Sequence, residues 1–205
     1  MELKKLSDIE IITTSNSKIN EVDFENLTFG NVFTDYMLVC DFENGAWQKP
    51  IITPYAPFLL DPSAKVFHYG QAIFEGMKAF KDNQDDVWLF RPDENFNRFN
   101  KSAKRMAMPE VPEDVFMGGL HRLLEIEKEW VKKGKGNTLY IRPFMIATGH
   151  GVIAAPSQSY RFMIILSPAR AYYSGEVKVV IAEHFSRAAN GGIGAAKAAG
   201  NYSAQ

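Results

Sequence analysis

The chain has a single cysteine, Cys40, among its 205 residues, so it can form no internal disulfide bond. A metal site built from clustered cysteines is excluded for the same reason, and so little cysteine suits a reducing compartment. Its four histidines are scattered without the spacing of metal ligands, and we interpret them as structural and expect no metal site. They are His68, His121, His150 and His184.

Net charge and long hydrophobic runs are also lacking. A formal net charge of -1 gives no electrostatic basis for binding nucleic acid or a membrane surface. The opening segment MELKKLSDIEIITTSNSK has no apolar stretch typical of a signal peptide. No later apolar run approaches the roughly 20 residues that a membrane-spanning helix requires. These absences predict a cytoplasmic protein whose partners are neither nucleic acids nor membranes.

What the chain does have is a 46% hydrophobic content, enough to bury a substantial core in one large domain, or in one domain and part of a second. Runs of β-branched and aromatic residues predict strands at 35–42, 161–166 and 177–182. The proline-rich segment 50–65 is expected to be a connector on the surface. The loop between the last two strands, SPARAYYSGE, is rich in turn residues and could join two domains.

Two helices and a hairpin are expected in the middle of the chain. Residues 74–80 and 87–90 flank a polar turn, which predicts a hairpin. Pro92 suits the first position of a helix, and acids follow it in the first turn. Arg98 lies off the apolar stripe of this helix, so it is either solvated or directed at an anion. Apolar residues at helical spacing predict a second, purely structural helix over 113–133. The first stripe is Phe96, Phe99, Ala103 and Met106, and the second is Phe116, Leu120, Leu123, Leu124 and Val131.

The segment 138–148 reads as a strand whose period of two places Tyr140 and Arg142 on one face, with Leu139 and Ile141 on the other. A tyrosine and an arginine side by side on an otherwise apolar strand indicate a carboxylate-binding site. The alternative is an edge strand with a polar outer face.

Near its end the chain carries GGIGAAKAAGNY, in which Lys197 stands among small residues and Tyr202 follows five positions later. A flat ligand could reach this amine from either side, which is the setting of a lysine that forms a Schiff base. A solvated lysine in a glycine-rich turn is the alternative. A phosphate-binding loop would need glycine before the lysine and Ser or Thr after it, whereas Ala196 and Ala198 occupy those places.

Five motifs together make the chain resemble the branched-chain amino acid aminotransferases, which are pyridoxal-phosphate enzymes of fold type IV. The motifs run in the family's order and span nearly the whole chain. They are FHYGQAIFEGMKAF (67–80), LFRPDENFNRFNKSAKRM (89–106), LYIRPFMIATG (139–149), SPARAYYSG (167–175) and GGIGAAKAAGNY (191–202). The resemblance implies an α/β fold (mixed α+β, multidomain). Residues 1–170 would form a small N-terminal α/β domain, 171–176 an interdomain loop, and 177–205 the beginning of a large pseudo-barrel domain.

The resemblance also implies the roles of individual residues. Lys197 would form a Schiff base with the aldehyde of pyridoxal 5'-phosphate, and Tyr202 would hydrogen-bond the phenolic oxygen of its ring. Arg98 would contact the cofactor phosphate, which explains an arginine off the apolar stripe. The substrate pocket would be lined by Tyr69, Phe74, Tyr140, Arg142 and Tyr172. Tyr69 would approach from the neighbouring subunit of a homodimer.

The implied reaction is amino transfer between leucine, isoleucine or valine and 2-oxoglutarate, with Lys197 as nucleophile and then as general base. Two alternatives remain open: another fold type IV enzyme, such as a D-amino acid aminotransferase or aminodeoxychorismate lyase, and a cofactor-binding or subunit-interaction fragment without turnover. Family members continue well past Tyr202 and carry there the acid that pairs with the pyridine nitrogen. We therefore expect these 205 residues to be inactive by themselves, with strand edges and apolar surface exposed over 177–205.

Overall fold

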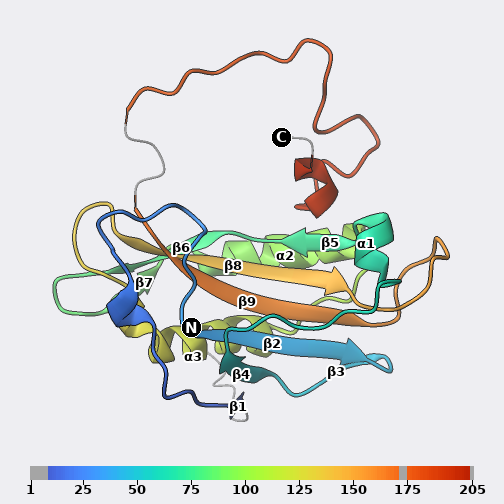
Figure 1. The fold of residues 1–205 in the computed structure, drawn as a ribbon. Helices are drawn as coiled ribbons and strands as arrows, with labels where there is room; N and C mark the ends of the chain where they lie inside the picture. The colour runs from blue at the N-terminus through green and yellow to red at the C-terminus, as the bar shows by residue number, and fades with distance from the viewer. Residues whose placement is uncertain (1–8, 171–174, 204–205) are drawn as a thin grey trace.

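The computed structural model describes residues 9–170 and 175–203, and over these residues the chain forms one large mixed sheet (Figure 1). The strand order is β1-β4-β2-β9-β8-β6-β7, with β3 beside β2 and β5 beside β8. Strands β1 and β4 are parallel, and the other pairs are antiparallel. The strands are β1 (Glu10–Ile11), β2 (Tyr36–Glu43), β3 (Ala46–Trp47), β4 (Ile51–Pro54), β5 (Ala72–Phe74), β6 (Met77–Lys81), β7 (Val87–Leu89), β8 (Thr138–Ala147) and β9 (Tyr160–Ala169). The predicted mixed α/β class is confirmed.

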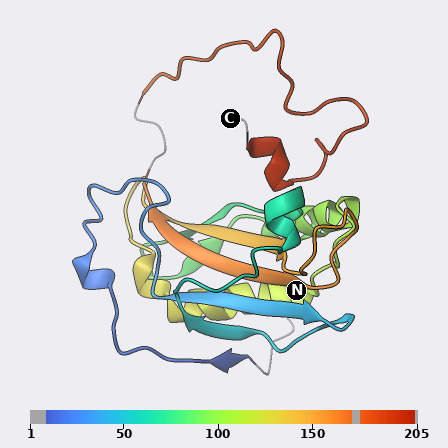
Figure 2. The same cartoon turned by 45° about the vertical axis from the view of Figure 1, so that its right-hand side comes forward.

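Few helices accompany the sheet. The α-helices are α1 (Lys65–Tyr69), α2 (Pro92–Arg105) and α3 (Gly119–Ile126), and the shorter turns are η1 (Ile19–Glu21), η2 (Asp114–Gly118), η3 (Lys128–Trp130) and η4 (Ala199–Tyr202). The segment 175–198 runs along the side of the sheet away from α3 and returns to η4 (Figure 1, Figure 2). None of the helices over 9–170 and 175–203 has the length and apolar character needed to cross a membrane.

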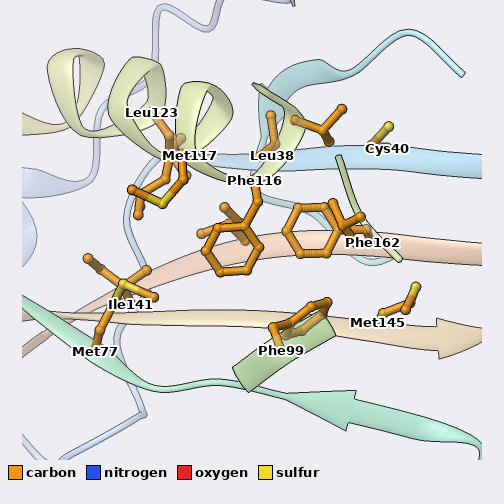
Figure 3. Close-up of a cluster of buried hydrophobic side chains, with 14 of the residues drawn as sticks. Leu38, Cys40, Met77, Phe99, Phe116, Met117, Leu123, Ile141, Met145 and Phe162 are labelled. Atoms are coloured by element: carbon orange, nitrogen blue, oxygen red, sulfur yellow. The ribbon is translucent and has the colours of Figure 1, made fainter. Parts of the chain in front are cut away.

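The core lies between the sheet and helices α2 and α3 (Figure 3). Phe162 of β9 stacks on Phe116 of η2 with ring centroids 5.5 Å apart, and it meets Phe99 of α2 edge-on at the same distance. On β8 the alternate residues Leu139 and Ile141 are fully buried in this core. The intervening residues of β8 therefore face the other side of the sheet, which is where the candidate site begins.

Most of the local expectations are confirmed. The strand at 35–42 is β2, shifted by one residue, and 161–166 lies within β9. The hairpin forms from β6 and β7, although residues 75–76 separate Phe74 from β6. Helix α2 begins at Pro92, with Asp93 and Glu94 in its first turn, as the proline and acids indicate.

The second helix is not continuous over 113–133. It starts as the π-helical turn η2, becomes α3, and ends at Ile126, after which η3 forms a tighter turn. The tighter turn places Trp130 in the core, where its indole N–H donates to Asp35 Oδ2 at 3.2 Å. All five residues of the predicted stripe are nevertheless buried. Tertiary contacts decide the helix ends, whereas periodicity finds the buried face.

The expectation of a surface connector over 50–65 is wrong at its beginning. Ile51–Pro54 is strand β4, which lies between β1 and β2, and Ile52 is fully buried. Pro54 stands at the end of the strand, where a missing N–H is tolerated. The rest of the segment up to Ala64 forms no strand or helix, and Leu59 is 98% exposed.

The strand predicted at 177–182 is also wrong, because these residues form no strand. The side chains of Val179, Val180 and Ile181 are between 85% and 94% exposed. A strand needs a neighbour to complete its hydrogen bonds, and the described part of the chain places no strand beside this segment. The apolar composition of this segment predicted that it pairs with a neighbouring strand, and the described part of the chain contains no such neighbour.

The buried Glu127 leads to a prediction about stability. Burial raises its pKa from 4.5 to about 7, the nearby Asp35 adds to the rise, and hydrogen bonds from Tyr36 N–H and Thr34 oppose it. From about pH 4.5 to about pH 7 the folded state holds a proton that the unfolded state releases. The free energy of unfolding should therefore fall as pH rises through this window. In Glu127→Gln this fall should be smaller, as measured by urea unfolding across the window, and an unchanged slope would contradict the assignment.

Candidate functional site

Lys197 lies against Phe74 and Tyr202, two residues to which the resemblance gives roles in the site. Its Nζ donates to the Tyr202 hydroxyl at 3.3 Å. The same amine is 4.4 Å from the ring centroid of Phe74 and 4.7 Å from that of Tyr202. The two rings meet edge-on, with centroids 5.0 Å apart. The Lys197 amine thus lies against the ring of Phe74 and against the ring and hydroxyl of Tyr202.

The backbone around Lys197 is tied to the edge of the sheet. Phe74 of β5 donates its N–H to the Lys197 carbonyl at 3.1 Å, and Ile73 pairs with Ala198. Asn201 closes the loop, because its Nδ2 donates to the carbonyls of residues 193 and 196 at 3.0 and 2.9 Å. Small residues are needed here: a Cβ added at Gly194 would lie 2.4 Å from the Cβ of a nearby alanine.

Tyr140 and Arg142 lie together on β8, as the alternation predicts. Arg142 donates from Nε and Nη2 to the Tyr140 hydroxyl at 3.2 and 2.8 Å, and its guanidinium lies 4.6 Å from the Phe74 ring centroid. The alternative of an edge strand is wrong, because β8 pairs with β9 on one side and with β5 and β6 on the other. A Cβ at Gly76 would come within 2.4 Å of the Tyr140 hydroxyl, so this glycine leaves room for the tyrosine.

A pocket of about 470 Å³ opens beside these residues, within the range typical of small-molecule sites. Its walls are mainly apolar, and Arg142 and Tyr202 are among the polar residues that line it. The lining residues are Ala72, Ile73, Phe74, Arg142, Phe144, Ile146, Ile165, Ala199, Tyr202 and Ser203. Such a pocket suits a small molecule with an apolar part and an anionic group.

Arg98 is held by a buried carboxylate. Its Nε and Nη2 donate to Glu75 at 2.5 and 2.8 Å, and Glu75 also accepts from Asn95 Nδ2 at 2.9 Å and Gly76 N–H at 3.1 Å. The Glu75 side chain is fully buried, whereas that of Arg98 is 55% exposed. This pairing raises the pKa of Arg98. Arg98 also lines a separate hollow of about 560 Å³. Ala195, which belongs to the loop around Lys197 (residues 191–202), lines the same hollow.

The prediction from sequence missed three residues that shape this site: Glu75, Ser102 and Asn201. The sequence offered two clues to Glu75. A single acid beside apolar residues needs a cationic partner, and Arg98 lies outside the apolar stripe of its helix. Ser102 follows Phe99 on the buried side of α2, and a polar residue there requires a partner. For Asn201 we find no signal beyond its place in the glycine-rich motif.

One predicted substrate residue, Tyr69, is not brought to Lys197. Tyr69 is 44% exposed on α1, and its hydroxyl donates to the Val152 carbonyl. Within the described part of the chain, no hydrogen bond or ring contact joins it to Lys197. Tyr172 lies outside the described residues.

Comparison with known proteins gives the same family as the motifs. The chain is 51% identical over 187 residues to branched-chain-amino-acid transaminase 1 of Bacillus subtilis (strain 168), a match that covers 89% of the chain and 52% of that relative. Branched-chain-amino-acid aminotransferase 2 of the same organism is 43% identical over 203 residues, which covers 97% of the chain and 55% of the relative. The resemblance to the branched-chain aminotransferases is confirmed.

The chain spans about half the length of these branched-chain aminotransferases. A solved aminotransferase from Brucella abortus, bound to the co-factor PLP, is similar in fold with a TM-score of 0.53. That match is 20% identical and covers 80% of the chain and 54% of the Brucella chain, so it supports the fold alone. No protein-family model matches the chain.

Proposed function

We propose that the whole protein is a branched-chain-amino-acid aminotransferase that uses pyridoxal 5'-phosphate. One observation carries the proposal: the amine of Lys197 lies against the rings of Phe74 and Tyr202, and these two residues line an apolar pocket together with Arg142. The two Bacillus subtilis relatives are named as branched-chain-amino-acid aminotransferases, and this supports the proposal. The chain matches about half the length of each.

The groups present fit the proposed cofactor. The site offers one amine that has no carboxylate partner in the described part of the chain, one phenol 3.3 Å from it, and one arginine with donors to spare. Glu75 occupies Nε and Nη2 of Arg98, so Nη1 is left to bind a phosphate. When bound, pyridoxal phosphate supplies an aldehyde for the lysine amine and a ring that accepts the electrons of a broken Cα–H bond.

Each of three residues would then have its own role in the reaction. Lys197 would hold the cofactor covalently, and after the substrate amine displaces it, the freed amine would move the proton at the substrate Cα. Tyr202 would hydrogen-bond the ring hydroxyl of the cofactor, since its own hydroxyl already lies beside the lysine amine. Phe74 would cover the site and exclude water.

One pocket must also accept two kinds of side chain. Its apolar walls suit the branched side chains of leucine, isoleucine and valine. Arg142 would bind the distal carboxylate of glutamate or 2-oxoglutarate, because it lines the pocket and its guanidinium lies over the ring of Phe74, another lining residue.

Replacing Arg142 with leucine should therefore separate the two half-reactions. The glutamate half-reaction should slow by about 10- to 100-fold, the equivalent of a charged hydrogen bond, and the leucine half-reaction by much less. Single-turnover rates measure both. Arg161→Leu is the matched control, because this strand arginine pairs with Asp41 instead. Equal losses in both half-reactions would remove the assignment.

The domain division and the dimer remain parts of this proposal. Strand β9 ends at Ala169, and residues 175–198 contain no helix or strand, which supports a boundary at 171–176. The exposure of Tyr69 supports its approach to a neighbouring subunit in a homodimer. A cytoplasmic location is supported by the single cysteine.

A further inference from the structure

Ser102 of α2 makes two side-chain hydrogen bonds, and one of them links the helix to the loop that carries Lys197. Its side chain is 1% exposed, and its hydroxyl donates to the Arg98 carbonyl at 2.9 Å. The same oxygen accepts the backbone N–H of Lys197, also at 2.9 Å. The hydroxyl proton is therefore directed at the helix, and an oxygen lone pair is directed at the lysine.

The peptide units on either side of Lys197 are thus held from two sides. Ser102 binds its N–H from α2, and Phe74 binds its carbonyl from β5 at 3.1 Å. The neighbouring Ala196 and Ala198 are buried at 3% and 0% exposure, so the loop cannot shift without disturbing the packing around it.

The same turn of helix carries Arg98, four residues before Ser102. Arg98 is anchored by Glu75, the residue that follows Phe74. A serine that bonds back to the carbonyl four residues earlier is common in helices and has no further meaning alone. Here the hydroxyl also takes the N–H of a residue from a distant segment, and that second bond is what separates Ser102 from an ordinary helix serine.

We propose that Ser102 is a positioning residue, which fixes the backbone of Lys197 relative to Arg98. This inference rests on the proposed function, in which Lys197 holds the cofactor covalently and Arg98 binds its phosphate. Ser102 would set the distance between these two anchors. A cofactor must satisfy both anchors at once, so loosening one should weaken binding wherever both are used.

The test compares Ser102→Ala with Ser157→Ala in the whole protein. Ser157 is a matched control, because it is 5% exposed and its hydroxyl also bonds backbone groups, at Ser159 and Gly149, which do not contact Lys197. Two ligands are titrated: pyridoxal phosphate, which can bond to the lysine, and pyridoxamine phosphate, which has no aldehyde. The dissociation constants and the urea midpoint are measured for each variant.

Ser102→Ala should raise the dissociation constant of pyridoxal phosphate about tenfold, the equivalent of one lost hydrogen bond, and that of pyridoxamine phosphate less than about twofold. Ser157→Ala should change neither, and Ser102→Thr, which keeps the hydroxyl, should restore the affinity. A merely structural serine would raise both constants equally or neither, and either result overturns the inference. Should Ser102→Ala not fold, Ser102→Cys replaces it with the same expectation. A wild-type protein that binds no pyridoxal phosphate would instead refute the proposed function.

Discussion

Replacing Lys197 with alanine is expected to abolish covalent binding of the cofactor and to slow amino transfer by roughly a thousandfold or more. The Lys197 amine lies against the rings of both Phe74 and Tyr202. An alanine there leaves the phosphate contacts in place, so some pyridoxal phosphate should remain bound without a bond to the protein. The visible absorption band of the protein-bound Schiff base and the turnover rate measure the two effects.

Lys178→Ala is the control for this change, because Lys178 is an exposed lysine of the same segment, 175–198. It should leave both the absorption band and the rate as in the wild type. If the band persisted unchanged in the Lys197 variant, another amine would have to be the attachment point, and the role given to this residue would be wrong.

The second large effect is expected from the Arg98–Glu75 pair. Replacing Arg98 with methionine leaves the Glu75 carboxylate fully buried with two of its four hydrogen bonds gone. The cost should be about 3 kcal/mol of unfolding free energy, the lower end of the range for a buried charge that loses its partner, because only the Glu75 side of this pair is buried. Glu75→Gln should cost less, because the Arg98 side chain is 55% exposed and can turn toward water.

The double variant, with both changes, should be more stable than Arg98→Met alone, since it has no unpaired buried charge. Urea unfolding of the two single variants and the double variant completes the cycle. Strictly additive losses would show that the two side chains do not depend on each other. Both variants that lack Arg98 should also bind inorganic phosphate more weakly than the wild type.

Local chemistry made some of this fold predictable. Pro92 and the acids after it marked the start of α2, and the alternation on β8 placed Tyr140 and Arg142 on one face. Strand β4 was not predicted, because the surrounding prolines indicated a surface connector. Residues 51–54 nevertheless pair in the sheet. The segment 177–182 shows the opposite error, because an apolar sequence forms a strand only where a neighbour offers hydrogen bonds.

The motifs predicted which residues lie at the candidate site, but they did not predict the hydrogen bonds that hold those residues in place. Lys197, Tyr202, Phe74 and Arg142 come together as the family resemblance implies. The sequence could not show that Ser102 binds the lysine backbone, because this contact joins residues 95 positions apart in the chain. Glu75 left a signal as a lone acid beside apolar residues, but its pairing with Arg98 depends on how β5, β6 and α2 pack.

The covalent role of Lys197 is the claim on which the other proposals depend. Borohydride reduction of the whole protein with pyridoxal phosphate, followed by peptide mapping, tests it most directly. We expect the label on the peptide that contains Lys197 and on no other. A label on a different lysine, or no label at all, would contradict the account.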